Sequence, residues 1–222
     1  MLWDVDYTLV SADGLGTRLY EVVFREMFGR ELTAVASKAG RTDRAIVADT
    51  LALVGEPRGH VDAFLAALEQ VAADGAVPGP VRALPGAAAA IAALAAAGLR
   101  QSVLTGNVRP LAALKLRRAG LGEHLDLDAG AYGDAHEVRA ELVTVARRAA
   151  GRAYGISFDG PATVLVGDTP LDVAAALATG ARAVGVATGS FPAADLAAAG
   201  AHAILPDLTD AGLVLDAVTG QP

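Results

Sequence analysis

From residue 84 onward, short apolar runs alternate with segments of helical periodicity, and this alternation constrains the fold most strongly. Strands are expected at 100–104, 163–166, 183–187 and 203–205, with a shorter one at 126–131. Helices are expected between them, at 87–97, 108–119, 138–152, 173–178 and 193–199. Alternating strands and helices are typical of a parallel, doubly wound sheet with helices on both faces.

The segment before residue 84 has a different pattern. An apolar run with interleaved acids, Leu2-Trp3-Asp4-Val5-Asp6, predicts a first strand, and only helical patterns follow it, at 15–28, 43–53 and 61–73. Three prolines and two glycines in residues 75–85 then separate this part from the alternating one. We therefore predict an α/β Rossmann-like core formed by residues 1–10 and 84–222, with a small α-helical cap inserted at 11–83.

The composition excludes several classes of function. The formal net charge of −7 and the pI of about 5.0 argue against a surface that binds nucleic acid or an anionic membrane. The chain has no cysteine, which excludes disulfides, thiolate metal sites and cysteine nucleophiles. No apolar run has transmembrane character and no secretory leader is apparent, so we expect a cytoplasmic protein.

Polar motifs follow three of the predicted strands. They are Asp4-Val5-Asp6-Tyr7-Thr8, Thr105-Gly106-Asn107, and the run from Gly167 to Asp172. In an open α/β sheet, ligands bind outside the carboxyl ends of the strands, so neighbouring strands would gather these carboxylates in one crevice. Crowded carboxylates need a cation, and oxygen ligands without thiolates favour a hard ion such as Mg²⁺.

These motifs, in this order, resemble those of the haloacid dehalogenase (HAD) superfamily in its phosphatase branch. The resemblance covers essentially the whole chain, including a helical cap after the first motif and Pro85-Gly86 where the chain re-enters the core. It implies that Asp4 is the nucleophile that becomes an aspartyl phosphate, and that Asp6 is the general acid/base whose backbone carbonyl also binds the metal. Asp6 is two residues from Asp4, so both side chains lie on the same side of the strand.

The resemblance also assigns binding residues. Thr105 would bind the phosphoryl oxygens, together with Gly106 and Asn107, and Mg²⁺ would be held by Asp4, Asp6, Asp168 and Asp172. In the cap, the loop Ala39-Gly40-Arg41-Thr42-Asp43 resembles one with which some relatives touch substrate, so Arg41 is a candidate for binding an anionic leaving group.

Two positions depart from the family pattern. Tyr7 stands where most relatives have glycine, which narrows the entrance or restricts the loop between core and cap. Relatives also have a cation, usually lysine, that neutralises the nucleophile and the phosphate. We assign that role to Arg139, at the start of a predicted helix, and keep Lys115 as the alternative. Lys115 follows Thr105 by about three helical turns, roughly 15 Å, and is out of reach if that helix runs straight away from the crevice.

The resemblance therefore implies a Mg²⁺-dependent phosphatase, a monomer or homodimer, that hydrolyses a small phosphorylated metabolite, with a phosphoglycolate phosphatase-like layout. Asp6 argues against a dehalogenase, which would not need the second acid. A phosphonate-cleaving enzyme would need a Schiff-base lysine in the cap, where Lys38 is the only lysine. A sugar-phosphate mutase and a catalytically silent binding protein with the same fold remain the alternatives. A response-regulator receiver would have adjacent acids and no long helical insertion.

Overall fold

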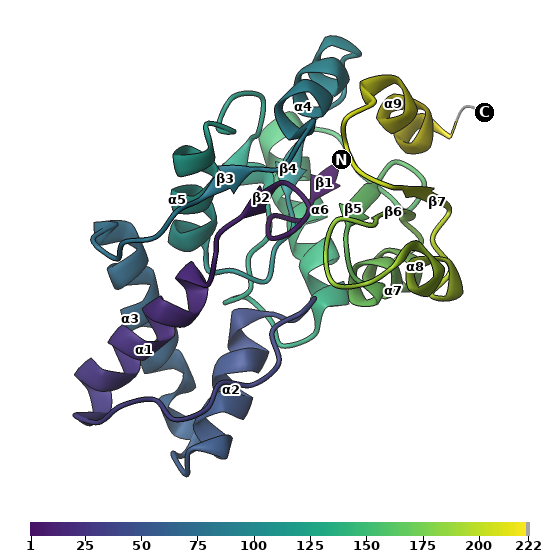
Figure 1. Ribbon diagram of the computed structural model, residues 1–222. Coiled ribbons are helices and arrows are strands. Elements are labelled where there is room, and N and C mark those ends of the chain that lie inside the picture. Colours follow the sequence, from purple (N-terminus) through teal and green to yellow (C-terminus); the bar gives the residue numbers. More distant parts are fainter. Residues whose placement is uncertain (221–222) are drawn as a thin grey trace.

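The computed structural model describes residues 1–220, and its central sheet has five parallel strands. The strands are β1 (Leu2–Trp3), β4 (Ser102–Val103), β5 (Val164–Gly167), β6 (Arg182–Val186) and β7 (Ala203–Leu205). Their order is β4-β1-β5-β6-β7, so the first strand lies inside the sheet between β4 and β5 (Figure 1). The predicted parallel α/β core is confirmed.

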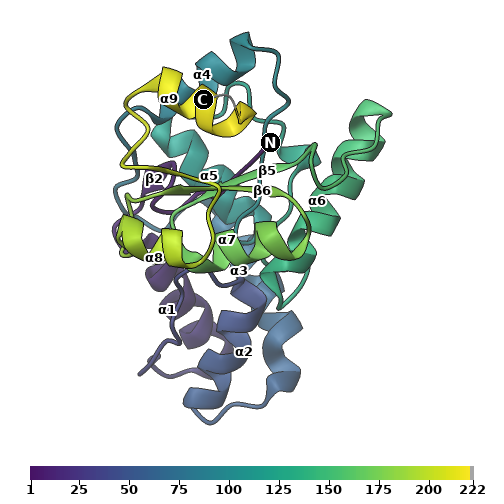
Figure 2. The same ribbon diagram turned by 90° about the vertical axis from the view of Figure 1, so that its right-hand side faces the viewer.

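Helices cover both faces of this sheet, as Figure 2 shows. One face carries α4 (Ala87–Ala96), α5 (Arg109–Ala119) and α9 (Ala211–Thr219), and the other carries α6 (Arg139–Tyr154), α7 (Pro170–Ala178) and α8 (Ala193–Ala198). Neighbouring residues of a strand point to opposite faces. Accordingly, Trp3 packs in the hydrophobic cluster on the side of α4, α5 and α9, and Leu2 packs in the cluster on the side of α6, α7 and α8. Burial on both faces explains why the strands read as continuous apolar runs.

Three further helices form a separate group beyond the carboxyl ends of the strands (Figure 1). They are α1 (Leu15–Phe28), α2 (Asp43–Leu53) and α3 (Val61–Asp74), and the short 3₁₀ helix η1 (Arg58–His60) precedes α3. Their buried residues, among them Phe24, Ile46 and Phe64, form their own hydrophobic cluster, which Leu111 and Leu114 of α5 join. None of the helices in residues 1–220 is long and apolar enough to cross a membrane.

The two connections between this helical group and the sheet run side by side. β2 (Val10–Ser11) pairs with β3 (Arg82–Ala83) in a short antiparallel ribbon. The predicted domain boundaries fall at this ribbon, and the division into two domains stays a prediction.

The structure corrects one predicted element and adds others. The strand expected at 126–131 is wrong over most of its length, because residues Leu127–Ala129 form the 3₁₀ helix η2. The Asp126 carboxylate accepts hydrogen bonds from the backbone N–H groups of Asp128 and Ala129, which stabilises this turn, and only Ala131 pairs, with Leu104. Helix α7 begins at Pro170, three residues earlier than predicted, and α9, β2 and β3 have no counterpart in the sequence-based expectation.

Candidate active site

The sheet order brings the three predicted motifs together. β1 pairs in parallel with β4 on one side and with β5 on the other, so their carboxyl ends meet at one edge. The ladder continues past β1, where the Asp4 N–H donates to the Val166 carbonyl at 2.8 Å. Asp4, Thr105 and Asp168 therefore leave three adjacent strands at the same level of the sheet, as expected for a ligand site in this class of fold.

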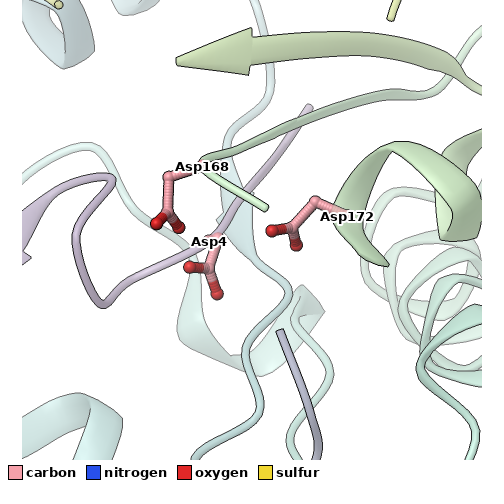
Figure 3. A group of neighbouring side chains, drawn as sticks. All are labelled: Asp4, Asp168 and Asp172. Atoms are coloured by element: carbon pink, nitrogen blue, oxygen red, sulfur yellow. The ribbon is translucent and has the colours of Figure 1, made fainter. Parts of the chain in front are cut away.

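Three buried carboxylates form the centre of the site (Figure 3). Asp4 follows β1, Asp168 follows β5, and Asp172 lies in the first turn of α7. Each offers one oxygen, and these oxygens lie within 4.8 Å of one another. Burial, together with the charge of Asp172, raises the pKa of Asp168 to about 7, and burial also raises the pKa of Asp4. Such a set of oxygen ligands fits a hard divalent cation.

The start of α7 fixes Asp172. The Thr169 hydroxyl accepts a hydrogen bond from the Asp172 N–H at 3.2 Å, and the Asp172 carboxylate accepts one from the Thr169 N–H at 3.1 Å. This reciprocal capping box, followed by proline at the first helical position, begins the helix at Pro170. The other oxygen of Asp172 is thereby left to face Arg139.

Arg139 reaches the predicted nucleophile. Its side chain is buried at the first residue of α6, and Nη2 lies 2.7 Å from Asp4 Oδ1 and 2.6 Å from Asp172 Oδ1. Nε donates a further hydrogen bond to Asp172 Oδ1 at 2.8 Å. Burial disfavours the charge of the guanidinium, but the carboxylates of Asp172 and Asp4 outweigh burial and raise its pKa. Arg139 therefore stays cationic beside Asp4, where a phosphoryl group would also meet it.

Lys115 also lies in the crevice, so the condition that would have placed it out of reach is not met. Its Nζ donates to both oxygens of Asp6, at 2.7 and 2.6 Å, and to Asn107 Oδ1 at 2.8 Å. Helical side chains tilt toward the helix N-terminus, so the long lysine side chain reaches back toward the strand end. The structure thus brings both candidate cations into the site, Arg139 on Asp4 and Lys115 on Asp6.

Asp6 is held by two partners. Besides Lys115, the Asn107 amide donates to Asp6 Oδ2 at 2.6 Å and to Thr105 Oγ at 2.9 Å. Burial alone would raise the pKa of Asp6, but Lys115 and Asn107 outweigh burial and lower it. In this arrangement Asp6 is a carboxylate, the form that can accept a proton.

Tyr7 turns the chain away from the strand. Its φ is 58°, in the left-handed region that glycine adopts at lower cost than tyrosine. The glycine of most relatives therefore matches the backbone geometry at this position. The Tyr7 side chain is half exposed and lines the cavity described below, as expected if it narrows the entrance.

The start of α2 is docked on the loops of the core. The N–H groups of Asp43 and Arg44 donate to the carbonyls of Gly106 (2.6 Å) and Gly133 (2.9 Å), and the Arg44 guanidinium donates to the Asp134 carbonyl at 2.6 Å. The Asp43 carboxylate accepts from the Val108 N–H at 2.7 Å. These hydrogen bonds close the helical group over the strand ends.

Arg41 lies in the loop before α2, and its guanidinium points toward α2 and its own loop. It forms an ion pair with Asp49 at 2.5 Å and donates to the carbonyls of Ser37 and Ala45. In this arrangement no hydrogen bond of the Arg41 side chain is directed at the carboxylate cluster. Its predicted contact with an anionic leaving group stays a prediction.

A cavity of about 240 Å³ lies between the carboxyl ends of the strands and the helical group. Most of the predicted residues line it, namely Asp4, Asp6, Arg41, Thr105, Gly106, Asn107, Lys115, Arg139 and Asp168. The helical group adds Tyr20, Lys38 and Asp43. Of these three residues, the sequence patterns gave no signal for Tyr20, placed Asp43 only within the loop 39–43, and made Lys38 a candidate only for a Schiff base.

Metal-free protein should become less stable as the pH rises from about 4 to about 7. The folded protein retains a proton on Asp168, whose pKa burial raises to about 7, whereas the unfolded chain loses it near pH 4. The stabilisation from this proton, on the order of 2 to 4 kcal/mol, is complete at a pH below the pKa of Asp168 in the unfolded chain. It is lost as the pH rises to the pKa of Asp168 in the folded protein. Calorimetry in EDTA between about pH 5 and about pH 8 would measure the change. If the variant Asp168→Asn showed the same dependence of stability on pH, this assignment would be contradicted.

Comparisons with known proteins agree with this geometry. The sequence profile of the haloacid dehalogenase-like hydrolases matches residues 1–177, whereas no curated protein matches the chain. A predicted phosphatase from Clostridium acetobutylicum has 17% identity and a TM-score of 0.69, over 97% of each chain. CbbY from Rhodobacter sphaeroides in complex with phosphate has 21% identity and a TM-score of 0.67, over 95% of each chain. A candidate β-phosphoglucomutase from Bacteroides vulgatus has 17% identity and a TM-score of 0.66, over 98% of this chain and 88% of that one.

At these identities the solved structures show a shared fold, and the profile shows descent. The profile spans most of the chain and includes all three strand-end motifs, from Asp4 to Asp172. This protein is therefore a member of the haloacid dehalogenase-like hydrolase family.

Proposed function

We propose that this protein is a Mg²⁺-dependent phosphatase that transfers the phosphoryl group of a small monoester to Asp4 and then to water. The observation that carries the proposal is the position of the Asp4 carboxylate. It lies on the wall of the cavity, with Arg139 on one oxygen and the carboxylates of Asp168 and Asp172 beside it. A phosphoryl group next to Asp4 would contact the Arg139 guanidinium, and a cation held by the carboxylates would add positive charge beside its oxygens.

In the first step, an Asp4 oxygen attacks phosphorus as the ester P–O bond breaks, which leaves an aspartyl phosphate and an alkoxide. The alkoxide takes a proton from Asp6, which stands two residues from the nucleophile and must carry a proton at this point. Because Asp6 is ionised in the substrate-free site, it has to take up this proton when the negatively charged substrate binds beside it, and the water of the second step supplies the proton for the next cycle. Thr105 and Arg139 bind the phosphoryl oxygens during the transfer.

In the second step, water attacks the aspartyl phosphate and the bond from phosphorus to the Asp4 oxygen breaks. The Asp6 carboxylate takes the proton from this water, and inorganic phosphate leaves. The contacts of Asp6 with Lys115 and Asn107 support this role, because they hold Asp6 in the ionised form.

The residues that would hold Mg²⁺ are Asp4, Asp168 and the backbone carbonyl of Asp6, with Asp172 beside them. When bound, Mg²⁺ would supply positive charge to the phosphoryl oxygens and relieve the repulsion between the carboxylates. Gly189 supports this arrangement, since a Cβ there would collide with Asp168 Oδ2 and push that carboxylate out of place.

Phosphate release should depend on added Mg²⁺. We expect the protein to release inorganic phosphate from one or more members of a panel of small phosphomonoesters when Mg²⁺ is present, and to stop when EDTA removes it. Restoring Mg²⁺ in excess of EDTA should restore the rate, which separates loss of metal from loss of fold. Equal release with and without EDTA would contradict the metal dependence, and no release from any ester would contradict the phosphatase function.

A sugar-phosphate mutase is the second candidate, because one of the similar structures is a candidate β-phosphoglucomutase. A mutase would return the phosphoryl group from Asp4 to a second hydroxyl of the sugar instead of to water. The same assay distinguishes the two, because a mutase converts a sugar phosphate to its isomer without releasing phosphate.

A further inference from the structure

Lys38 reaches the cavity from the helical group. It lies in the segment between α1 and α2, lines the cavity, and is partly buried. Its Nζ donates to the Thr17 hydroxyl at 2.6 Å and lies 4.9 Å from the centre of the Tyr20 ring. Both partners are on α1, so the ammonium is held against one wall of the cavity by uncharged groups.

The other cations on the cavity wall already have carboxylate partners. Arg139 is paired with Asp4 and Asp172, Lys115 with Asp6, and Arg41 with Asp49. Within residues 1–220, no carboxylate lies at ion-pairing distance from the Lys38 ammonium. A partly buried charge without a counter-ion is costly, and the cost is recovered when an anion binds to it.

The ammonium keeps its charge at neutral pH. Burial lowers the pKa of Lys38 to about 8, while the carboxylates of Asp43 and Asp6 act in the opposite direction. Neither carboxylate is free to become its partner. Asp43 accepts hydrogen bonds from the Tyr20 hydroxyl (2.8 Å) and the Val108 N–H (2.7 Å), and Asp6 is held by Lys115 and Asn107.

We infer that Lys38 binds a second anionic group of the substrate, a carboxylate or a second phosphate, separated from the transferred phosphoryl group by a short spacer. This inference rests on the proposed function, which places the phosphoryl group at Asp4. Asp4 lines the cavity of about 240 Å³ from the sheet and Lys38 lines it from the helical group, so both face the space that the substrate would occupy. Lys38 would then set substrate specificity and would be a binding residue, not a catalytic one.

The test compares esters that differ only in the second charge. The first pair is phosphoglycolate and its neutral amide, phosphoglycolamide, which have nearly the same shape and test a carboxylate as the second anionic group. The second pair is 1,2-ethanediol bisphosphate and 1,2-ethanediol monophosphate, which tests a second phosphate. We expect the protein to prefer the anionic member of at least one pair by about 10- to 100-fold in kcat/KM, the range of a charge-assisted hydrogen bond. Lys38→Met should lower that preference to about threefold or less.

Two further variants separate binding from folding. Lys38→Arg keeps the charge and should keep most of the preference. Arg25→Met removes a positive charge from α1 at an exposed position that does not line the cavity, and should leave the preference unchanged. A role of Lys38 in packing against Tyr20 alone would lower the unfolding temperature and slow both members of a pair equally.

The outcomes also separate this inference from the proposed function. Turnover of both members of each pair at equal kcat/KM, or a preference that survives in Lys38→Met, would overturn the inference and leave the phosphatase standing. Turnover of no phosphomonoester at all would overturn the proposed function and the inference with it. A preference confined to one pair would identify the second group as a carboxylate or as a phosphate.

Discussion

Replacement of Asp4 by asparagine should lower the rate of phosphate release by about 10⁴-fold or more, while the protein stays folded. The amide has nearly the shape of the carboxylate but cannot form the phosphoryl intermediate. Its oxygen can still accept the hydrogen bond from Arg139, which Asp4 accepts at 2.7 Å. Steady-state phosphate release with the best ester of the panel would measure the effect.

The same variant has an expected effect on stability. Burial and the neighbouring carboxylates raise the pKa of Asp4, which means that its negative charge is unfavourable in the folded, metal-free protein. Removing this charge should leave the unfolding temperature in EDTA unchanged or raise it. Asp195→Asn, at an exposed position of α8, is the matched control and should keep full activity. Substantial phosphate release by folded Asp4→Asn would remove Asp4 from the mechanism.

Replacement of Arg139 by methionine should lower kcat/KM by about 100- to 1000-fold, comparable to the loss of one donor to a developing negative charge. It should also destabilise the fold by about 3 to 5 kcal/mol in the absence of metal, because Asp4 and Asp172 lose the buried cation between them. Phosphate release and urea unfolding measure the two effects separately. Arg148→Met, at an exposed position on the same helix, should change stability by no more than about 0.5 kcal/mol.

Lys115→Met distinguishes the two candidate cations. Lys115 contacts Asp6 and not Asp4, so its loss should lower kcat with a smaller effect on inhibition by inorganic phosphate. Arg139→Met should weaken that inhibition strongly, and Arg139→Lys should retain part of it because the charge remains. If Lys115→Met abolished phosphate inhibition and Arg139→Met did not, the neutralising role would belong to Lys115.

Much of the fold follows from local patterns. Helices α1 and α2 occupy the predicted residues 15–28 and 43–53, because an amphipathic stripe and nearby glycine or threonine end signals mark both. The failure at 126–131 has a local cause as well. Asp126 offers its side chain to the backbone N–H groups that a strand would need, and this competition cannot be read from apolar spacing.

The sequence by itself determined the α/β class, the place of the helical insertion and the three motifs at the strand ends. A short apolar run that ends in Asp, Thr or Gly-Asp specifies both a buried strand and the polar group that follows it.

What only the tertiary structure decided is which charges meet. The order β4-β1-β5 sets Asp4 between Thr105 and Asp168, and the orientation of α5 brings Lys115 back to Asp6. Arg41 and Lys38 carry the same charge, lie three positions apart and both line the cavity, yet Arg41 is paired with Asp49 of α2 whereas Lys38 donates to the uncharged Thr17 hydroxyl of α1. Periodicity reports which face of a helix is apolar, whereas a charged side chain is placed by the partners that long-range packing brings within its reach.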